Sequence, residues 1–281
     1  MRRNRLSAAM QETPDLEAVF PMLDIEFAEA SDCGLVRPHN EDYIGHSVPS
    51  SPQHARSRGW VFVLADGVGG QDRGEEASRI AVETILAECA NSPAGENSAG
   101  LFSRSIQTAN SRVYEAGHGS IATTLVACLL RFDRATVAHV GDSRCYLIRH
   151  GRARRLTRDH TMLNEKSRLN VFGAGESQRT MMRSVLSRSV GCNLFVAPEI
   201  SEHHVIPGDL LLLCSDGLHG AVSDHHIAQI VTSAGSLGEA ARQLISIANQ
   251  NDGGDNVSVQ LIRIKEVEAV GMYRGRPYRL H

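Results

Sequence analysis

The chain has 281 residues, a formal net charge of −3 at neutral pH and 42% hydrophobic residues. This length allows one large domain or two small ones, and this hydrophobic fraction allows a buried core. The small negative charge argues against a nucleic-acid binder, and no apolar run reaches the roughly 18 residues of a membrane helix. The six cysteines show no Cys-x-x-Cys spacing, which predicts reduced thiols in a cytoplasmic protein.

Polar segments flank one predicted domain. Residues 1–24 form a polar leader that Pro14 and Pro21 interrupt, and it lacks the long apolar stretch of a secretory signal. Residues 266–281 form a charged tail that contains Gly and Pro. Between them, residues 25–265 show no linker-like break and no internal repeat, so we expect a single domain there.

The first predicted elements are one strand and two helices. Trp60–Ala65 is short and apolar throughout, which is typical of a strand buried on both faces. From Glu75 to Cys89, apolar residues recur at spacings of three and four, as on one face of a helix. The segment from Phe102 to Ala116 repeats this pattern, so we expect a pair of helices.

The middle of the chain is predicted to be rich in strands. The long apolar run Ile121–Phe132 indicates a buried strand, and Ala135–Val140 indicates another. Cys145–Ile148 and Arg152–Leu156 are joined at His150-Gly151, a pair of residues typical of a hairpin turn.

Two more strands and a second helix pair follow. Leu210–Cys214 is a third apolar run that indicates a buried strand, and Val257–Ile264 has the composition of a strand. Ser223 can cap one helix, and Ser236 with Glu239 forms a capping-box signature before the next. Strands and helix pairs are segregated along the chain, which favours a layered α+β domain with sheets inside and helices outside.

Acidic residues stand at the ends of the predicted buried strands. A charged group there is costly unless something compensates its charge. A single Asp-Gly is usually only a turn, but several such sites together indicate a shared ligand. Carboxylates without His or Cys select hard cations, Mg²⁺ or Mn²⁺, over zinc. These residues are Glu41 with Asp42, Asp66, Asp142, Asp216 and Asp255.

The motifs around these residues, in their order, resemble the metal-dependent (type 2C, PPM) serine/threonine protein phosphatases, particularly the compact bacterial ones. The resemblance runs from about Phe27 to Ile264. It implies a sandwich of two antiparallel β-sheets flanked by antiparallel helix pairs. The matching segments include GLVRPHNED (Gly34–Asp42), LADGVGG (Leu64–Gly70), VGDSRCYL (Val140–Leu147), PGDLLLLCSDGL (Pro207–Leu218) and GGDNVSV (Gly253–Val259).

The resemblance implies a site for two Mn²⁺ or Mg²⁺ ions. Asp66, Asp216 and Asp255 would hold the first ion. Asp66 and the carbonyl of Gly67 would hold the second, which Glu41 would contact directly or through water. Asp66 would therefore bridge the two ions.

The resemblance also implies roles for residues that do not hold the two ions. Arg37 matches the phosphate-binding arginine, while Asp42 and Asn256 look like residues that orient the metal ligands. Asp142 corresponds to a residue that contributes to a third, weaker metal position, and the alternative is that it only caps a turn. Val68 stands where some family members have a histidine that is a candidate acid for the leaving group, so the identity of that acid stays open.

The resulting prediction is a phosphatase that hydrolyses phosphoserine and phosphothreonine on proteins with a metal-activated water, and so reverses a serine/threonine kinase. Its partners would be phosphorylated proteins and a cognate kinase, and we expect a monomer without nucleic-acid or membrane partners. One alternative is a catalytically silent regulator that binds phosphoproteins or a kinase with the same fold. Another is a metallohydrolase for small phosphoesters.

Several other motifs are given structural interpretations. Cys128-x5-Arg134 has the spacing of a cysteine-dependent phosphatase, but the segment between lacks glycine and is predicted to be a strand, so we reject that chemistry. His203 and His204 would point to opposite faces of a strand and could not share an ion. His160 is interpreted as structural. Residues 163–182 match the variable flap beside the family's active site.

Overall fold

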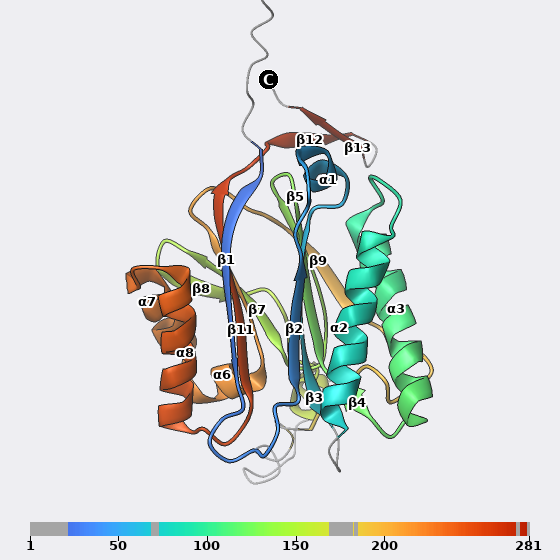
Figure 1. The fold of residues 1–281 in the computed structure, drawn as a ribbon, viewed down its shortest axis with the longest axis vertical. Helices are drawn as coiled ribbons and strands as arrows, with labels where there is room; N and C mark the ends of the chain where they lie inside the picture. Colours follow the sequence, from blue (N-terminus) through green and yellow to red (C-terminus); the bar gives the residue numbers. More distant parts are fainter. Residues whose placement is uncertain (1–21, 69–72, 169–181, 183–184, 274–275, 280–281) are drawn as a thin grey trace, which may run out of the picture.

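The computed structural model describes residues 22–68, 73–168, 182, 185–273 and 276–279. At its centre two antiparallel β-sheets pack face to face, and helices cover both outer faces (Figure 1). This is the α+β sandwich that the resemblance implies, so the fold prediction is confirmed. Within the described ranges, no helix is both long and apolar enough to cross a membrane.

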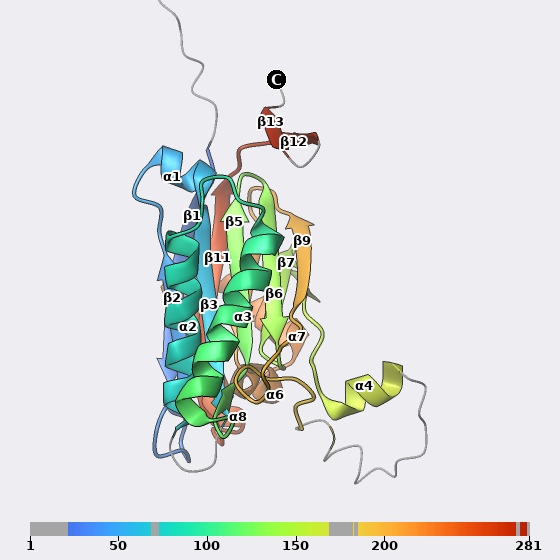
Figure 2. The ribbon, with the colours of Figure 1, turned by 90° about the vertical axis from the view of Figure 1, so that its right-hand side faces the viewer.

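The first sheet has the strand order β2-β3-β5-β6-β9, and the short strand β4 pairs with β3. Helices α2 (Gly74–Ala90) and α3 (Ser98–Gly117) pack on its outer face and share a buried apolar cluster with it (Figure 2). The strands are β2 (Asp42–Ser47), β3 (Trp60–Val68), β4 (Ala122–Thr123), β5 (Leu125–Arg131), β6 (Arg134–Val140) and β9 (Glu199–His204).

The second sheet has the strand order β1-β11-β10-β7-β8, which leaves β1 and β8 at its edges. Three helices share an apolar cluster with its outer face: α6 (Asp216–Ala221), α7 (Asp224–Ser233) and α8 (Leu237–Asn251). The strands are β1 (Asp24–Asp32), β11 (Val257–Glu266), β10 (Leu210–Cys214), β7 (Arg144–Arg149) and β8 (Arg152–Arg155).

The remaining elements lie at the two ends of the sandwich. At one end are α1 (Pro52–Ser57) and the hairpin of β12 (Val270–Tyr273) and β13 (Arg276–Arg279) (Figure 1). Arg56 of α1 forms an ion pair of 2.8 Å with the buried Glu268, just before that hairpin. At the other end α4 (Met162–Arg168) projects from the body (Figure 2). The proposed domain limits, 25 and 265, each fall one residue inside the outer ends of β1 and β11 and stay a prediction.

The apolar strand runs are explained by burial on both faces. In β10, Leu210 and Leu212 belong to the cluster under the helices, whereas Leu211 and Leu213 belong to the cluster between the sheets. Each such side chain contributes roughly 1.5–3 kcal/mol through removal from water. Two of the three runs that predicted strands buried on both faces, Trp60–Ala65 and Leu210–Cys214, are therefore found where expected.

One predicted strand is interrupted. The run Ile121–Phe132 forms β4 and β5, which Thr124 separates. The amide of Thr124 donates to the carbonyl oxygen of Asp66 at 2.8 Å, and its hydroxyl accepts from the amide of Asp66 at 3.0 Å. The chain thus wraps around the Asp66 peptide instead of continuing one straight ladder. An apolar pattern cannot reveal this contact, because the partner is a distant backbone.

The predicted turn and helix caps are confirmed. His150 and Gly151 both adopt positive φ, 51° and 71°, between β7 and β8. Ser223 accepts a hydrogen bond from the amide of His226, and Ser236 accepts one from the amide of Glu239. Each serine therefore satisfies one of the free amides at the start of its helix.

Candidate metal centre

The antiparallel order of the strands brings the acidic residues together. β3, β6 and β10 end at the same end of the sandwich at which β2 and β11 begin. A cleft of about 390 Å³ lies there. The cleft includes every residue that the sequence suggests as a metal ligand, together with Arg37. Its lining is Arg37, Glu41, Asp66, Gly67, Val68, Thr124, Asp142, Leu186, Asp216 and Asp255.

Asp66 and Gly67 are fixed in the last part of β3 by their backbone contacts. The hydroxyl of Thr123 donates to the carbonyl oxygen of Asp66 at 2.8 Å, in addition to the two contacts from Thr124. A Cβ on Gly67 would lie 2.2 Å from the carbonyl oxygen of Gly74 and 2.7 Å from that of Glu41. Glycine is therefore required for β2, β3 and α2 to approach one another beside Asp66.

The carboxylates of the cleft repel one another. Burial raises the pKa of Asp66 well above its ordinary value, and the charges of Asp42 and Asp216 raise it further. Burial and the charge of Asp216 raise the pKa of Asp142 to about 7. Burial and the charge of Asp255 also raise the pKa of Asp216. Positive charge inside the cleft would relieve this repulsion and restore the ionised forms.

The residues of the cleft fit a hard divalent cation. Asp216 Oδ1 is buried and has no hydrogen-bond partner in the described part of the chain, which is costly unless an ion contacts it. The available donor atoms are carboxylate and carbonyl oxygens, the ligands that Mg²⁺ and Mn²⁺ prefer. Among the residues that the structure describes, no histidine or cysteine lines the cleft, so its donor set does not favour zinc.

Asp42 and Asn256 lie behind the cleft, where both are buried. Asp42 accepts a hydrogen bond of 2.8 Å from the hydroxyl of Ser215. Asn256 Oδ1 accepts from the amide of Glu41 at 2.8 Å, while its Nδ2 donates to the carbonyl oxygens of Cys33 and His39. Asn256 thus ties the start of β11 to the loop that carries Arg37 and Glu41.

Arg37 reaches the cleft from that loop. Its Nη2 lies 2.9 Å from Asp255 Oδ2, and its side chain is 47% exposed. The guanidinium therefore has further N–H groups free to meet an anion in the cleft, where a planar fork can bind two phosphate oxygens.

Sequence reasoning missed three positioning groups. Thr124 holds the Asp66 peptide, and Ser215 holds the carboxylate of Asp42. His219 of α6 donates from Nε2 to the carbonyl oxygen of Asp142 at 3.0 Å, and burial lowers its pKa to about 4, which keeps it neutral. The only signal for His219 was its position one helical turn after Asp216, and the only signal for Ser215 was its place directly before Asp216 in the segment PGDLLLLCSDGL.

A separate histidine cluster lies beside the cleft. Candidate ligand atoms of His139, His160 and Glu199 lie within 4.8 Å of one another. The two rings stack with centroids 4.6 Å apart, so their lone pairs do not converge on one ion. The amide of Gly141 donates to His160 Nδ1 at 3.2 Å, which leaves the proton of the neutral ring on Nε2, facing Glu199. These contacts support the structural interpretation of His160.

The remaining motifs lie away from the cleft. Cys128 is fully buried in β5, and burial raises the pKa of its thiol to about 12, so it is no reactive thiolate. His203 contacts Ser201 and His204 contacts Asp133, which leaves no shared ion between the two histidines. Of the predicted flap, only residues 163–168 and 182 lie within the described ranges.

Known proteins share both the sequence and the fold. A family model described as protein phosphatase 2C matches residues 30–257. Protein phosphatase PhpP of Streptococcus pneumoniae is 29% identical over 251 residues, which cover 87% of this chain and all of that protein. Serine/threonine phosphatase stp of Listeria welshimeri is 30% identical over 240 residues, covering 83% of this chain and 93% of that one.

Solved structures give the same result. The serine/threonine phosphatase of S. agalactiae superimposes with a TM-score of 0.78 at 30% identity, covering 86% of this chain and all of that chain. The catalytic domain of the phosphatase PstP, solved with two manganese ions, gives a TM-score of 0.73 at 28% identity. The match covers 87% of this chain and all of that chain.

A two-sheet sandwich with an oxygen-lined carboxylate cleft and an arginine at its rim defines a metal-dependent hydrolase that acts on phosphate esters. The chain belongs to the protein phosphatase 2C family. It is accordingly a metal-dependent protein serine/threonine phosphatase, and its substrates are phosphoproteins.

Proposed function

We propose that this phosphatase works at the carboxylate cleft with two Mn²⁺ or Mg²⁺ ions bound there. Asp66, Asp216 and Asp255 would hold one ion, while Asp66, the Gly67 carbonyl and Glu41 would hold the other. The observation that carries this proposal is that these residues, which come from four separate segments of the sequence, all line one cleft. The two manganese ions of the PstP structure support the same number here.

The chain's own residues position the substrate. When bound, the ions supply Lewis acidity, which activates water and offsets the charge of the phosphoryl group. Arg37 would bind the phosphate oxygens, and Asn256 would keep the Arg37 loop against β11. Val68 is 44% exposed at the cleft and carries no transferable proton, so the leaving oxygen must take its proton from another donor.

We also propose that Asp142 contributes to a third, weaker cation position. Its carboxylate lines the same cleft, and the charge of Asp216 is one cause of its raised pKa. His219 fixes the Asp142 backbone in place. The alternative is a carboxylate that only caps the turn before Ser143.

The cellular setting can be proposed from the same chemistry. The six cysteines are all free, which suits the reducing cytoplasm. A phosphatase for phosphoserine and phosphothreonine needs a serine/threonine kinase to supply its substrate. The cleft is complete within one chain, so a monomer would be sufficient for activity.

Turnover of a phosphothreonine peptide, compared with that of a small aryl phosphate, tests the proposal. We expect metal-dependent hydrolysis of both, with the higher kcat/KM on the peptide. If neither substrate is hydrolysed but the phosphopeptide still binds, the result would favour the silent regulator. A higher kcat/KM on the aryl phosphate would favour a small-molecule hydrolase.

A further inference from the structure

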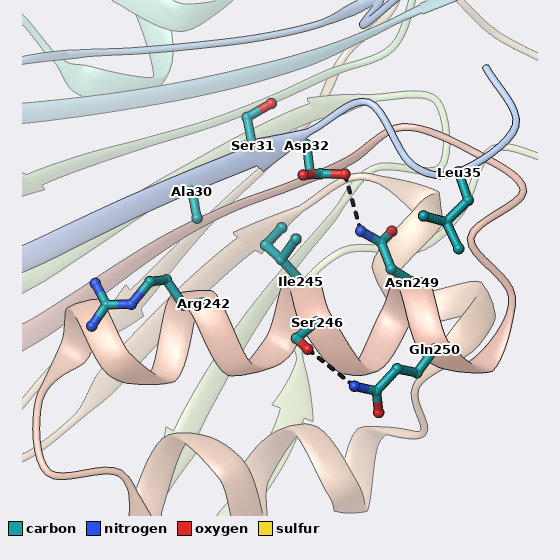
Figure 3. Close-up of a pocket in the computed structure, with 9 residues that line it drawn as sticks. All are labelled: Ala30, Ser31, Asp32, Leu35, Arg242, Ile245, Ser246, Asn249 and Gln250. Atoms are coloured by element: carbon teal, nitrogen blue, oxygen red, sulfur yellow. Dashed lines mark hydrogen bonds between the residues drawn. The ribbon is translucent and has the colours of Figure 1, made fainter. Parts of the chain in front are cut away.

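An open groove runs between the edge strand β1 and helix α8, outside the metal cleft (Figure 3). Its volume is about 520 Å³. Ala30 on β1 and Ser246 on α8 both have small side chains, and Ile245 projects from α8 toward β1 (Figure 3). Leu35 and Arg242 stand at its opposite ends (Figure 3).

One end of the groove is firmly built. Asp32 Oδ1 accepts hydrogen bonds from the amide of Gly34 at 2.9 Å and from Asn249 Nδ2 at 3.0 Å (Figure 3). The amide of Leu35 donates to the carbonyl oxygen of Gly253 at 2.8 Å. The backbone of Leu35 is thus fixed, yet its side chain is 73% exposed. A fixed and exposed leucine is available for contact with an apolar partner.

The strand beside the groove can accept another strand. β1 pairs with β11 on one side only, within the part of the chain that the structure describes. Its alternate backbone amides and carbonyls on the other side are therefore open to an extended peptide, as in other domains that bind peptides by strand addition. From Arg242 to Asn249 the helix rises about 10 Å, which matches roughly three residues of extended chain.

The chemistry of the groove indicates what such a peptide carries. Arg242 is exposed, and no acidic partner contacts it within the described ranges. An acidic side chain would complement it at that end, as an apolar side chain would complement Leu35 at the other.

The Leu35 end of the groove lies beside the segments that carry two residues of the catalytic cleft. Leu35 stands two residues before Arg37, and Gly253, which holds the Leu35 backbone, stands two residues before Asp255. Arg37 and Asp255 both line the cleft. A chain that places its phosphorylated residue in the cleft can therefore extend past the Leu35 end of the groove.

We propose that this groove docks an extended segment of the phosphoprotein substrate itself, with an apolar side chain against Leu35 and an acidic side chain toward Arg242. This inference rests on the proposed function and deepens it, because it names a sequence feature of the substrates. Docking at this position raises the affinity for the substrate and leaves the chemical step unchanged.

The test uses phosphothreonine peptides that carry a Leu-x-Glu flank roughly four to eight residues to either side of the phosphothreonine, beyond the cleft. The reference peptides carry a Gly-Ser flank in its place. At one placement we expect kcat/KM to rise by roughly fivefold to tenfold through a lower KM, the scale of one leucine that an open groove buries only in part and one exposed ion pair.

Variants assign that gain to the groove. Ser246→Trp fills the groove and should abolish the gain, whereas Gln243→Trp, on the same helix but outside the lining, should keep it. Arg242→Glu should transfer the preference to a Leu-x-Lys flank. If the gain in kcat/KM persists in Ser246→Trp, or if neither placement of the flank gives a gain, the docking proposal is wrong. Continued hydrolysis of the Gly-Ser peptides separates that result from a failure of the proposed function, in which no peptide would be hydrolysed.

Discussion

At the scale of single residues, the described lining of the cleft combines several carboxylates with one positively charged side chain, that of Arg37. Arg37 is therefore the group there that attracts an incoming anion. Arg37→Ala should lower kcat/KM on a phosphothreonine peptide by roughly 10- to 100-fold, because a charge-assisted contact contributes about 1.5–3 kcal/mol. Metal affinity should change little. Steady-state kinetics at saturating Mn²⁺, with calorimetric metal titration, measure both quantities.

Arg37→Lys is the matched control for that prediction. Lysine keeps the positive charge but cannot bind two phosphate oxygens with one planar group, so its kcat/KM should fall between those of the wild type and Arg37→Ala. A wild-type kcat/KM in Arg37→Ala would show that Arg37 does not bind the phosphate.

A variant of Asp142 distinguishes its two possible roles, as a ligand of a third cation or as a turn residue. Asp142→Ala should keep two tightly bound ions but lose roughly tenfold or more in turnover, because a weak third position beside them is removed. Metal titration and kinetics on the same preparation test this. Unchanged turnover would make Asp142 only a turn residue, and loss of all metal would make it a principal ligand or a folding determinant.

The stacked histidines predict a pH dependence of stability. Burial and the neighbouring His139 lower the pKa of His160 to about 4, with Arg188 lowering it and Glu199 raising it. In the unfolded chain His160 takes up a proton near pH 6.5, whereas in the folded chain it stays neutral until the pH is near 4. The free energy of unfolding therefore falls as the pH drops from about 6.5 toward 4. At pH 5 this effect should cost about 2 kcal/mol.

A matched variant isolates that contribution. Asn at position 160 can still accept the hydrogen bond from Gly141, but it does not titrate. Between pH 7.5 and pH 5, at the same metal saturation, the free energy of unfolding should fall by about 2 kcal/mol more in the wild type than in His160→Asn. Equal losses in the two proteins would mean that His160 does not contribute.

Residue types at strand ends made much of the site predictable. Asp66 directly follows an apolar run, Asp216 follows another after one serine, and both precede glycine, so the cost of burying their charge pointed to an ion. Thr124 and His219 could not be predicted in this way. Their partners are backbone atoms of Asp66 and Asp142, 58 and 77 positions away in the sequence, and side-chain periodicity carries no information about such contacts.

At the scale of elements, local chemistry predicted helix boundaries better than strand connections. α8 begins after Ser236, as the capping box indicates, although the Glu239 side chain accepts from the amide of Gly235 and not from that of Ser236 itself. β1 and β2 were not predicted, because their residues are mostly half-buried and alternate only weakly. Edge strands such as β1 lack the continuous apolar run that identified β10.

The cap of α8 gives a prediction at this scale. Ser236→Ala should lower the free energy of unfolding by about 1 kcal/mol, because an amide in the first turn loses its partner. Turnover should not change, because Ser236 lies at the end of α8 that is about 20 Å from the end nearer the cleft. Chemical denaturation and kinetics measure the two effects.

Ser233→Ala is the control for the cap. Ser233 is also an exposed serine, at the end of α7, but its hydroxyl donates to the carbonyl oxygen of Ile230 and caps no free amide. Its loss should change stability by less than about 0.5 kcal/mol. An equal loss in the two variants would contradict the capping role of Ser236.

At the scale of the whole molecule, periodicity indicated layers of sheets and helices, but it could not choose the pairing of the strands. The order β1-β11-β10-β7-β8 joins the first strand to the one that begins at Val257, and only the resemblance of the ordered motifs implied the sandwich. That pairing has a direct functional consequence. It places the start of β11, with Asp255, next to the loop of Arg37 and Glu41.

The central claim is that hydrolysis depends on divalent cations held by the carboxylate cleft. The most direct measurement is phosphate release from a phosphothreonine peptide by chelator-stripped protein, titrated with Mn²⁺ or Mg²⁺, with Asp66→Asn in parallel. We predict no turnover without metal, saturable recovery in the wild type, and turnover lower by about 100-fold or more in the variant, because Asp66 would contact both ions. Undiminished turnover in the metal-free protein or in Asp66→Asn would contradict the account.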